Sequence, residues 1–224
     1  MNADLLPSLR RLVRGLTALF WGLPSTLLVC VLMVMAEFPR ALGCMPPIIT
    51  TGLLLFGVLE LARFRREERD WQLGISRAQL LALANFGLSP FVYFWSRQPT
   101  EAYYLQVVIA LAFTGVLFLC QLNHLLQRLV AMLPDETLRA DTRFFTRLNL
   151  TLMLLGLGLI GGYHLLAQFN YLPQSVIEAL DLAQAARIRF ALVVVLVLLP
   201  VSMTMSLLWK TRDVVLGSVF GARS

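Results

Sequence analysis

Six apolar runs, each about as long as a membrane helix, constrain the fold of this chain more than any other feature. They lie near residues 16–36, 41–62, 78–95, 103–126, 148–169 and 188–209. An α-helix rises 1.5 Å per residue, so about 20 residues cross the roughly 30 Å hydrocarbon core of a bilayer. The sequence therefore predicts an all-α integral membrane bundle of six transmembrane helices, forming a single domain over residues 1–224. The run near 78–95 is the shortest, and a re-entrant segment is the alternative there.

The composition agrees with a membrane protein. Of the 224 residues, 58% are hydrophobic and 14% are charged. Soluble domains are about half apolar and about a quarter charged. A soluble chain of this size could not bury so much apolar surface, whereas a bilayer can solvate it.

The basic residues predict how the bundle is oriented. Six spans with a cytoplasmic N-terminus put 15 of the 19 lysines and arginines in cytoplasmic segments, leaving only Arg40, Arg97, Arg187 and Arg189 outside. This bias follows the positive-inside rule and predicts that both termini are cytoplasmic in a multi-pass protein of a bacterial-type inner membrane. The N-terminal arginines also permit a signal peptide, but the apolar run of about 21 residues exceeds the usual 7–15.

Two connectors are predicted to form short interfacial helices. In residues 123–149, Arg139, Arg143 and Arg147 recur at helical spacing and are candidate lipid-headgroup contacts, since cations near an anionic leaflet are attracted to it. The alternatives are a solvated connector and a docking site for a partner. After Pro173, Ser175 and Glu178 form a capping-box pattern that opens a second amphipathic helix.

Polar residues inside the apolar runs are candidates for an intramembrane site. Asn85 and Ser89 share a face of the third run, and His164 and Gln168 lie one turn apart in the fifth. Hydrogen bonding between helices is the ordinary role of such side chains. A proton relay or ligand contact is the alternative, because ionisable groups at membrane depth often mark a functional path.

The cytoplasmic end of the fourth run carries another polar face. Gln121, His124 and Arg128 fall on one side of the helix, and we expect a structural end-turn at the membrane interface. Glu60, near the cytoplasmic end of the second run, lies within helical reach of Arg63.

Glycines in the fifth run predict close helix packing. Gly158 and Gly162 form a GxxxG pair that allows two helices to approach. The four glycines assigned to helix packing are Gly156, Gly158, Gly161 and Gly162.

Metal and disulfide chemistry are not indicated. The three cysteines are scattered, with no CxxC, and the two histidines lie on different runs. We therefore expect no metal and no cofactor.

A limited resemblance to rhomboid-type intramembrane proteases concerns Ser89, which follows Gly-x, and His164, which lies on a glycine-rich run. That family also has six spans. Here, however, Pro90 follows the serine where the family has glycine. The serine and histidine are in the third and fifth runs, where the family uses the fourth and sixth. An intramembrane hydrolase is thus the most remote of three alternatives.

No catalytic constellation is present in the sequence, so we expect that the protein is not an enzyme. The leading hypothesis is a non-catalytic scaffold or accessory subunit that binds other membrane proteins, a second copy of itself, or membrane lipids. The alternative is a small permease with a midplane site at Asn85, Ser89 and His164. Nucleic acid is not expected as a partner, because the mixed charges of residues 62–71 suit a solvated helix.

Overall fold

The computed structural model describes residues 5–35, 42–64, 69–131, 136–168 and 186–220. Within these ranges the chain forms α-helices and no strand, which confirms the predicted helical class. The helices are α1 (Leu5–Met35), α2 (Met45–Ala62), α3 (Arg69–Leu88), α4 (Pro90–Arg97), α5 (Ala102–Ala131), α6 (Glu136–Gln168) and α8 (Ala186–Phe220).

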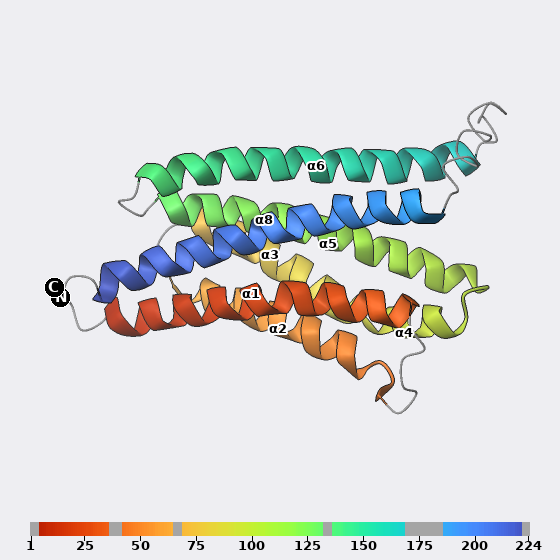
Figure 1. Ribbon diagram of the computed structural model, residues 1–224. Coiled ribbons are helices and arrows are strands. Elements are labelled where there is room, and N and C mark those ends of the chain that lie inside the picture. The colour runs from red at the N-terminus through yellow and green to blue at the C-terminus, as the bar shows by residue number, and fades with distance from the viewer. Residues whose placement is uncertain (1–4, 36–41, 65–68, 132–135, 169–185, 221–224) are drawn as a thin grey trace.

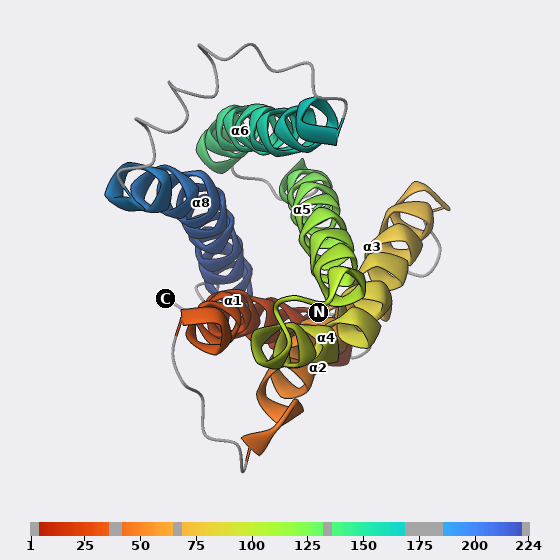
Figure 2. The same cartoon turned by 90° about the vertical axis from the view of Figure 1, so that its right-hand side faces the viewer.

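The helices form an elongated bundle in which successive passes reverse direction (Figure 1). The chain runs out along α1, back along α2, out along α3 and α4, and back along α5. It then runs out along α6 and back along α8, so that α1 begins and α8 ends at the same end of the bundle. Viewed along its length, α6 lies on the opposite side from α2, with α5 and α8 between α6 and α1 (Figure 2).

Three helical segments of the described chain are long and apolar enough to cross a membrane: Ser8–Val34, Met45–Ala62 and Ala102–Ala131. They coincide with the first, second and fourth predicted runs. Mean hydropathy over the whole chain is +0.74. Six membrane spans remain a prediction.

The third predicted run is helical, but it is interrupted. Pro90 has no backbone N–H and cannot continue the hydrogen-bond ladder of α3, so α3 ends at Leu88 and α4 begins at Pro90. Together α3 and α4 extend from the end of the bundle where α2 finishes to the end where α5 begins (Figure 1). This path is that of a full pass along the bundle.

The predicted interfacial helix in residues 123–149 is wrong as a separate element. Residues up to Ala131 continue α5, and α6 begins at Glu136 and runs without interruption to Gln168. The basic stripe and the fifth apolar run therefore share one helix, because nothing between them breaks the helical pattern. The second predicted interfacial helix, after Pro173, falls outside the described residues.

Leucine-rich faces of α1, α2, α3 and α5 form the core. Leu16 and Leu19 of α1, Val58 of α2, Ile75 of α3 and Leu122 of α5 are all 1% exposed or less. Many large apolar side chains instead lie on the outside of the bundle, including Ile49, Leu80, Leu83, Phe113 and Leu154. An exterior with so many apolar side chains is compatible with lipid tails surrounding the bundle.

Glycine brings α1 and α2 into close contact. A Cβ at Gly57 would lie 2.8 Å from Cγ of Leu19 and 3.1 Å from the backbone oxygen of Gly15. A Cβ at Gly22 would lie 2.7 Å from Leu54. Small residues let helix backbones approach in this way. This close approach joins the first two helices of the chain, where the sequence did not predict one.

Candidate functional site

Ser89 occupies the interruption between α3 and α4 and is only 1% exposed. Pro90 would have donated to the carbonyl of Phe86 had it carried an N–H. The hydroxyl of Ser89 donates to that carbonyl instead, at 2.9 Å, and it accepts a hydrogen bond from Thr51 of α2 at 3.1 Å. Ser89 therefore satisfies a backbone group and joins α3 to α2.

Asn85, one turn earlier, faces a different helix. Its side-chain oxygen accepts a 2.8 Å hydrogen bond from the hydroxyl of Thr114 on α5. The two polar residues of the third run thus bond to α5 and α2 respectively, which is the interhelical role expected of small polar side chains within a bundle. His164 and Gln168 belong to α6, but their side chains lie outside the described part of the structure. A common site for all four remains a prediction.

A second polar cluster joins α5, α6 and α8. The amide nitrogen of Asn123 donates to the hydroxyl of Thr204 at 2.9 Å, and that of Asn149 donates to the same hydroxyl at 3.0 Å. Thr204 in turn donates to the carbonyl of Pro200 at 2.8 Å, and Asn149 donates to that carbonyl at 3.3 Å. Asn123, Asn149 and Thr204 are fully buried.

Sequence reasoning missed this cluster. Asn123 and Asn149 were the two ends of the stretch predicted to be a connector. The available signal was the stripe Thr142, Thr146 and Asn149 at helical spacing, all of which are at most 2% exposed. Small polar residues that recur on one face of a helix indicate a face that packs against other polar groups.

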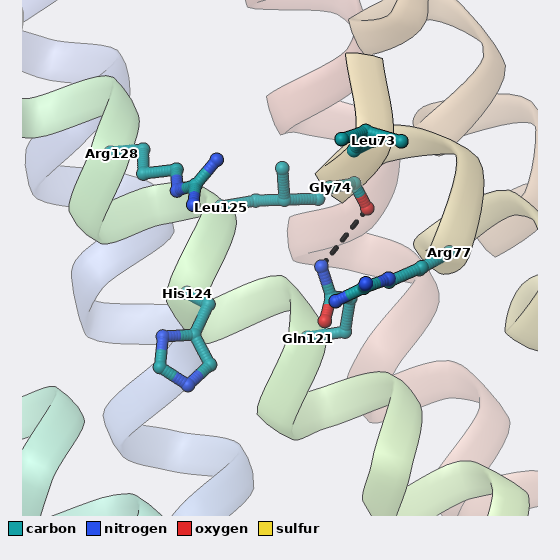
Figure 3. Close-up of a pocket in the computed structure, with 7 residues that line it drawn as sticks. All are labelled: Leu73, Gly74, Arg77, Gln121, His124, Leu125 and Arg128. Atoms are coloured by element: carbon teal, nitrogen blue, oxygen red, sulfur yellow. Dashed lines mark hydrogen bonds between the residues drawn. The ribbon is translucent and has the colours of Figure 1, made fainter. Parts of the chain in front are cut away.

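A basic site lies between α3 and α5, near the start of α3 and the end of α5. A cavity of about 300 Å³ is lined by Leu73, Gly74, Arg77, Gln121, His124, Leu125 and Arg128. The amide of Gln121 donates to the carbonyl of Gly74 at 3.0 Å and so links the two helices. Figure 3 shows Arg77 extending from α3 toward Gln121, while His124 and Arg128 project from adjacent turns of α5.

The predicted face of Gln121, His124 and Arg128 is therefore present, and it is joined by Arg77 from another helix. The cavity combines two guanidinium groups, an imidazole and an amide with apolar walls. Such donors suit an anion, because arginine binds carboxylate and phosphate through a planar set of N–H groups. No lining residue carries a carboxylate.

A second, more open cavity of about 460 Å³ lies between α2 and α3 and is lined by Leu59, Ala62, Arg63, Gln72 and Gln79. Arg63 forms an ion pair with buried Glu60, at 3.1 Å. The predicted pairing of these two residues is present, and the carboxylate reduces the positive charge at this cavity.

The basic stripe lies at the start of α6. Arg143 and Arg147 are exposed, and Arg139 donates to the carbonyl of Ala131 at 3.2 Å. Arg139 thus contacts the end of α5. Contact of the three arginines with lipid headgroups remains a prediction.

The predicted glycine interface is only partly described. A Cβ at Gly158 would meet nothing within 4 Å, so this residue makes no close helix approach within the described part of the chain. Gly156 is buried. The surroundings of Gly161 and Gly162 lie outside the described side chains.

Among the described residues, no three histidine, cysteine, aspartate or glutamate side chains gather where they could hold a metal ion. Comparison with protein-family models, with curated proteins and with solved structures finds no match to this chain.

Proposed function

We propose that the protein is a non-catalytic scaffold or accessory subunit of a bacterial-type cytoplasmic membrane. In this proposal it crosses the membrane six times, with both termini cytoplasmic, and binds other membrane proteins or lipids. The observation that carries the proposal is the use made of its buried polar residues. Asn85, Ser89, Asn123 and Asn149 bond to neighbouring helices, and neither cavity is lined by any of them.

The distribution of charge along the bundle supports this orientation. One end of the bundle holds six helix termini (Figure 1). They are the starts of α1, α3 and α6 and the ends of α2, α5 and α8. These helix ends carry most of the arginines, including Arg10, Arg63, Arg77, Arg128 and Arg143. An end so rich in arginine suits the cytoplasmic face.

The opposite end carries aromatic residues. Phe94 stacks on Tyr104 with ring centroids 6.0 Å apart. The ring centroids of Phe91 and Tyr103 are 6.2 Å apart in an edge-on contact. The guanidinium of Arg97 lies 5.5 Å from the ring centroid of Tyr93. Tyrosines concentrate where the hydrocarbon core meets the headgroups. This cluster at the junction of α4 and α5 suits the outer membrane interface.

The mass of the purified protein in mild detergent, with identification of co-purifying proteins and lipids, tests the proposal. We expect the protein to co-purify with a protein partner at a fixed stoichiometry, or with tightly bound lipid and no bound solute. A monomer or homodimer that holds a specific small molecule would favour the permease. In that case a His164→Ala variant should lose the small molecule. Release of the protein from membranes by alkaline carbonate would contradict the membrane placement itself.

A further inference from the structure

We propose that the junction of α5, α6 and α8 binds one ordered water molecule, held by Asn123, Thr146 and Asn149. The water donates hydrogen bonds to the side-chain oxygens of the two asparagines and accepts one from the hydroxyl of Thr146. Thr204 of α8 is the fourth residue of this junction, since both asparagine amides donate to it. The inference depends on the packing of these three helices and is independent of the function proposed above.

Three buried oxygen atoms carry the inference. Within the described part of the chain, the side-chain oxygens of Asn123, Thr146 and Asn149 are buried without a hydrogen-bond partner. The three residues are at most 2% exposed. A threonine in a helix can donate to the carbonyl four residues earlier, as Thr151 does on the same helix, whereas the hydroxyl of Thr146 does not. Because such atoms are costly to bury unpaired, buried polar groups of this kind are commonly satisfied by ordered water.

The orientation of both asparagine side chains is fixed by backbone carbonyls. The amide nitrogen of Asn123 lies 2.8 Å from the carbonyl oxygen of Leu119, and that of Asn149 lies 3.3 Å from the carbonyl oxygen of Pro200. A carbonyl can only accept a hydrogen bond, so the nitrogen of each amide must face it. Turning either amide over would bring two acceptors together. The two side-chain oxygens therefore stay on the other side of each amide, where they need a donor.

The shared hydroxyl of Thr204 cannot be that donor. It gives its one hydrogen to the carbonyl of Pro200 at 2.8 Å and accepts from both amides. Contact with one hydroxyl also keeps the two asparagines close together. Thr146 precedes Asn149 by three residues on α6 and so lies on the same face of that helix. The three unpartnered oxygens therefore belong to one junction.

One water molecule matches this set of atoms. Its two hydrogens serve the two asparagine oxygens, and its own oxygen accepts the hydrogen of the threonine hydroxyl. A buried water in a protein typically makes about three hydrogen bonds to groups that would otherwise be unsatisfied. The junction offers two acceptors and one donor, which is the set that a single water can satisfy.

A neutral ligand suits the junction better than a metal cation does. Oxygen atoms also bind hard cations, but a buried charge needs a counter-charge. No aspartate or glutamate lies within four residues of any of the four junction residues along the sequence. Arg147, directly after Thr146, adds a positive charge. Burial of a cation here would therefore be unfavourable, whereas water carries no charge to be compensated.

Buried hydroxyls lead from the junction toward the arginine-rich end of the bundle. Thr142 lies one turn before the junction on α6, and Thr211 lies two turns after it on α8, and both are buried. The two helices stay adjacent at this level, because Nζ of Lys210 lies 5.7 Å from the ring centroid of Phe145. The start of α6 and the end of α8 lie at that end (Figure 1). Water can enter the junction along these hydroxyls.

The test is a crystal structure of the full-length protein in lipid, at a resolution that shows ordered solvent. Crystals grown with sodium are also soaked in thallium(I), an alkali-cation substitute that anomalous scattering identifies. The test variant is Thr146→Val, which keeps the size of the side chain and removes the hydroxyl. The control is Thr151→Val on the same helix, because that exposed hydroxyl donates to the carbonyl of Arg147.

We expect the wild type and the control to show one solvent peak within hydrogen-bond distance of the three oxygens, without anomalous signal. The peak should be lost in Thr146→Val. A double-mutant cycle of Thr146→Val with Asn123→Leu gives a second measurement. We expect non-additivity of about threefold in the unfolding equilibrium constant, because the water couples two side chains that share no described hydrogen bond. The cycle of Thr151→Val with Asn123→Leu should be additive.

A wild-type junction without a solvent peak would overturn the proposal, and this result does not require any variant to fold. An anomalous peak after the thallium soak would replace the water by a cation site. A peak that persists unchanged in Thr146→Val would refute the assigned hydrogen bonds. Additivity in both cycles would show that no bound molecule couples α5 to α6 at this point.

Discussion

The amide of Asn123 on α5 donates a 2.9 Å hydrogen bond to the hydroxyl of Thr204 on α8, which lies 81 residues further along the chain. Asn149 on α6 donates to the same hydroxyl. Within the described residues, the side-chain oxygens of both asparagines are buried without a hydrogen-bond partner. One hydroxyl therefore holds three helices together, and its removal would leave two buried amides with fewer partners.

Replacement of this hydroxyl should destabilise the bundle. Thr204→Val keeps the size of the side chain and removes the acceptor of both asparagines. We expect a loss of about 1–2 kcal/mol in the free energy of unfolding, because interhelical hydrogen bonds in membranes contribute modestly and each buried amide loses one of its acceptors. Denaturation in mixed micelles measures it. Ser202→Ala is the control, since that exposed hydroxyl donates to the carbonyl of Leu199 in its own helix. Equal stability of the two variants would refute the role of Thr204.

The contact between α1 and α2 should not tolerate a larger side chain at Gly57. A Cβ there meets Leu19 and the backbone oxygen of Gly15, and a backbone atom cannot move aside easily. Gly57→Leu should cost about 1–3 kcal/mol, as overpacking does in other cores. The melting temperature in detergent reports it. Gly158→Ala, where a Cβ meets nothing within 4 Å, should leave the melting temperature unchanged or raise it.

The hydrogen bond between Thr51 and Ser89 should appear as a coupling energy. In a double-mutant cycle of Thr51→Val and Ser89→Ala, we expect about 0.5–1 kcal/mol of non-additivity in the free energy of unfolding. The cycle of Thr17→Val with Ser89→Ala is the control, because Thr17 bonds to the carbonyl of Val13 in its own helix. Additivity in both cycles would show that the bond does not stabilise the bundle.

Cysteine labelling should reveal the proposed orientation. Starting from a variant without Cys30, Cys44 and Cys120, we expect Thr100→Cys to react with a membrane-impermeant maleimide in cells whose inner membrane is intact. Ala140→Cys should react only after the membrane is opened. Both positions are exposed and lie toward opposite ends of the bundle. The reverse pattern would place the arginine-rich end outside, against the positive-inside rule.

The helices and their order could be predicted from the sequence, because apolar runs of membrane length leave few other structures open to the chain. Local chemistry also located the polar face of Gln121, His124 and Arg128. These inferences need only residues within one helix, so spacing along the sequence was sufficient for them.

The partners between helices could not be predicted in the same way. Spacing shows that Ser89 and Asn85 share a face of the helix, but not that one bonds to α2 and the other to α5. Arg77 was counted only as a cytoplasmic charge, because its proximity to Arg128 depends on how closely α3 packs against α5. The GxxxG pair of Gly158 and Gly162 remains a prediction, since the surroundings of Gly162 lie outside the described side chains. Close approaches of helices that the sequence did not predict occur at Gly15 and Gly57.

The hydroxyl shared by Asn123 and Asn149 has a consequence for the order of assembly. A ribosome completes α5 and α6 before it reaches Thr204, so both asparagines are synthesised before their common partner. Until α8 is made, the amide of Asn123 can still donate to the carbonyl of Leu119 in its own helix, whereas the described partners of the Asn149 amide, Thr204 and Pro200, are both on α8. Asn149 therefore reaches these hydrogen bonds only after α8 is made, and a nascent chain stalled before α8 would carry this amide without Thr204 and Pro200.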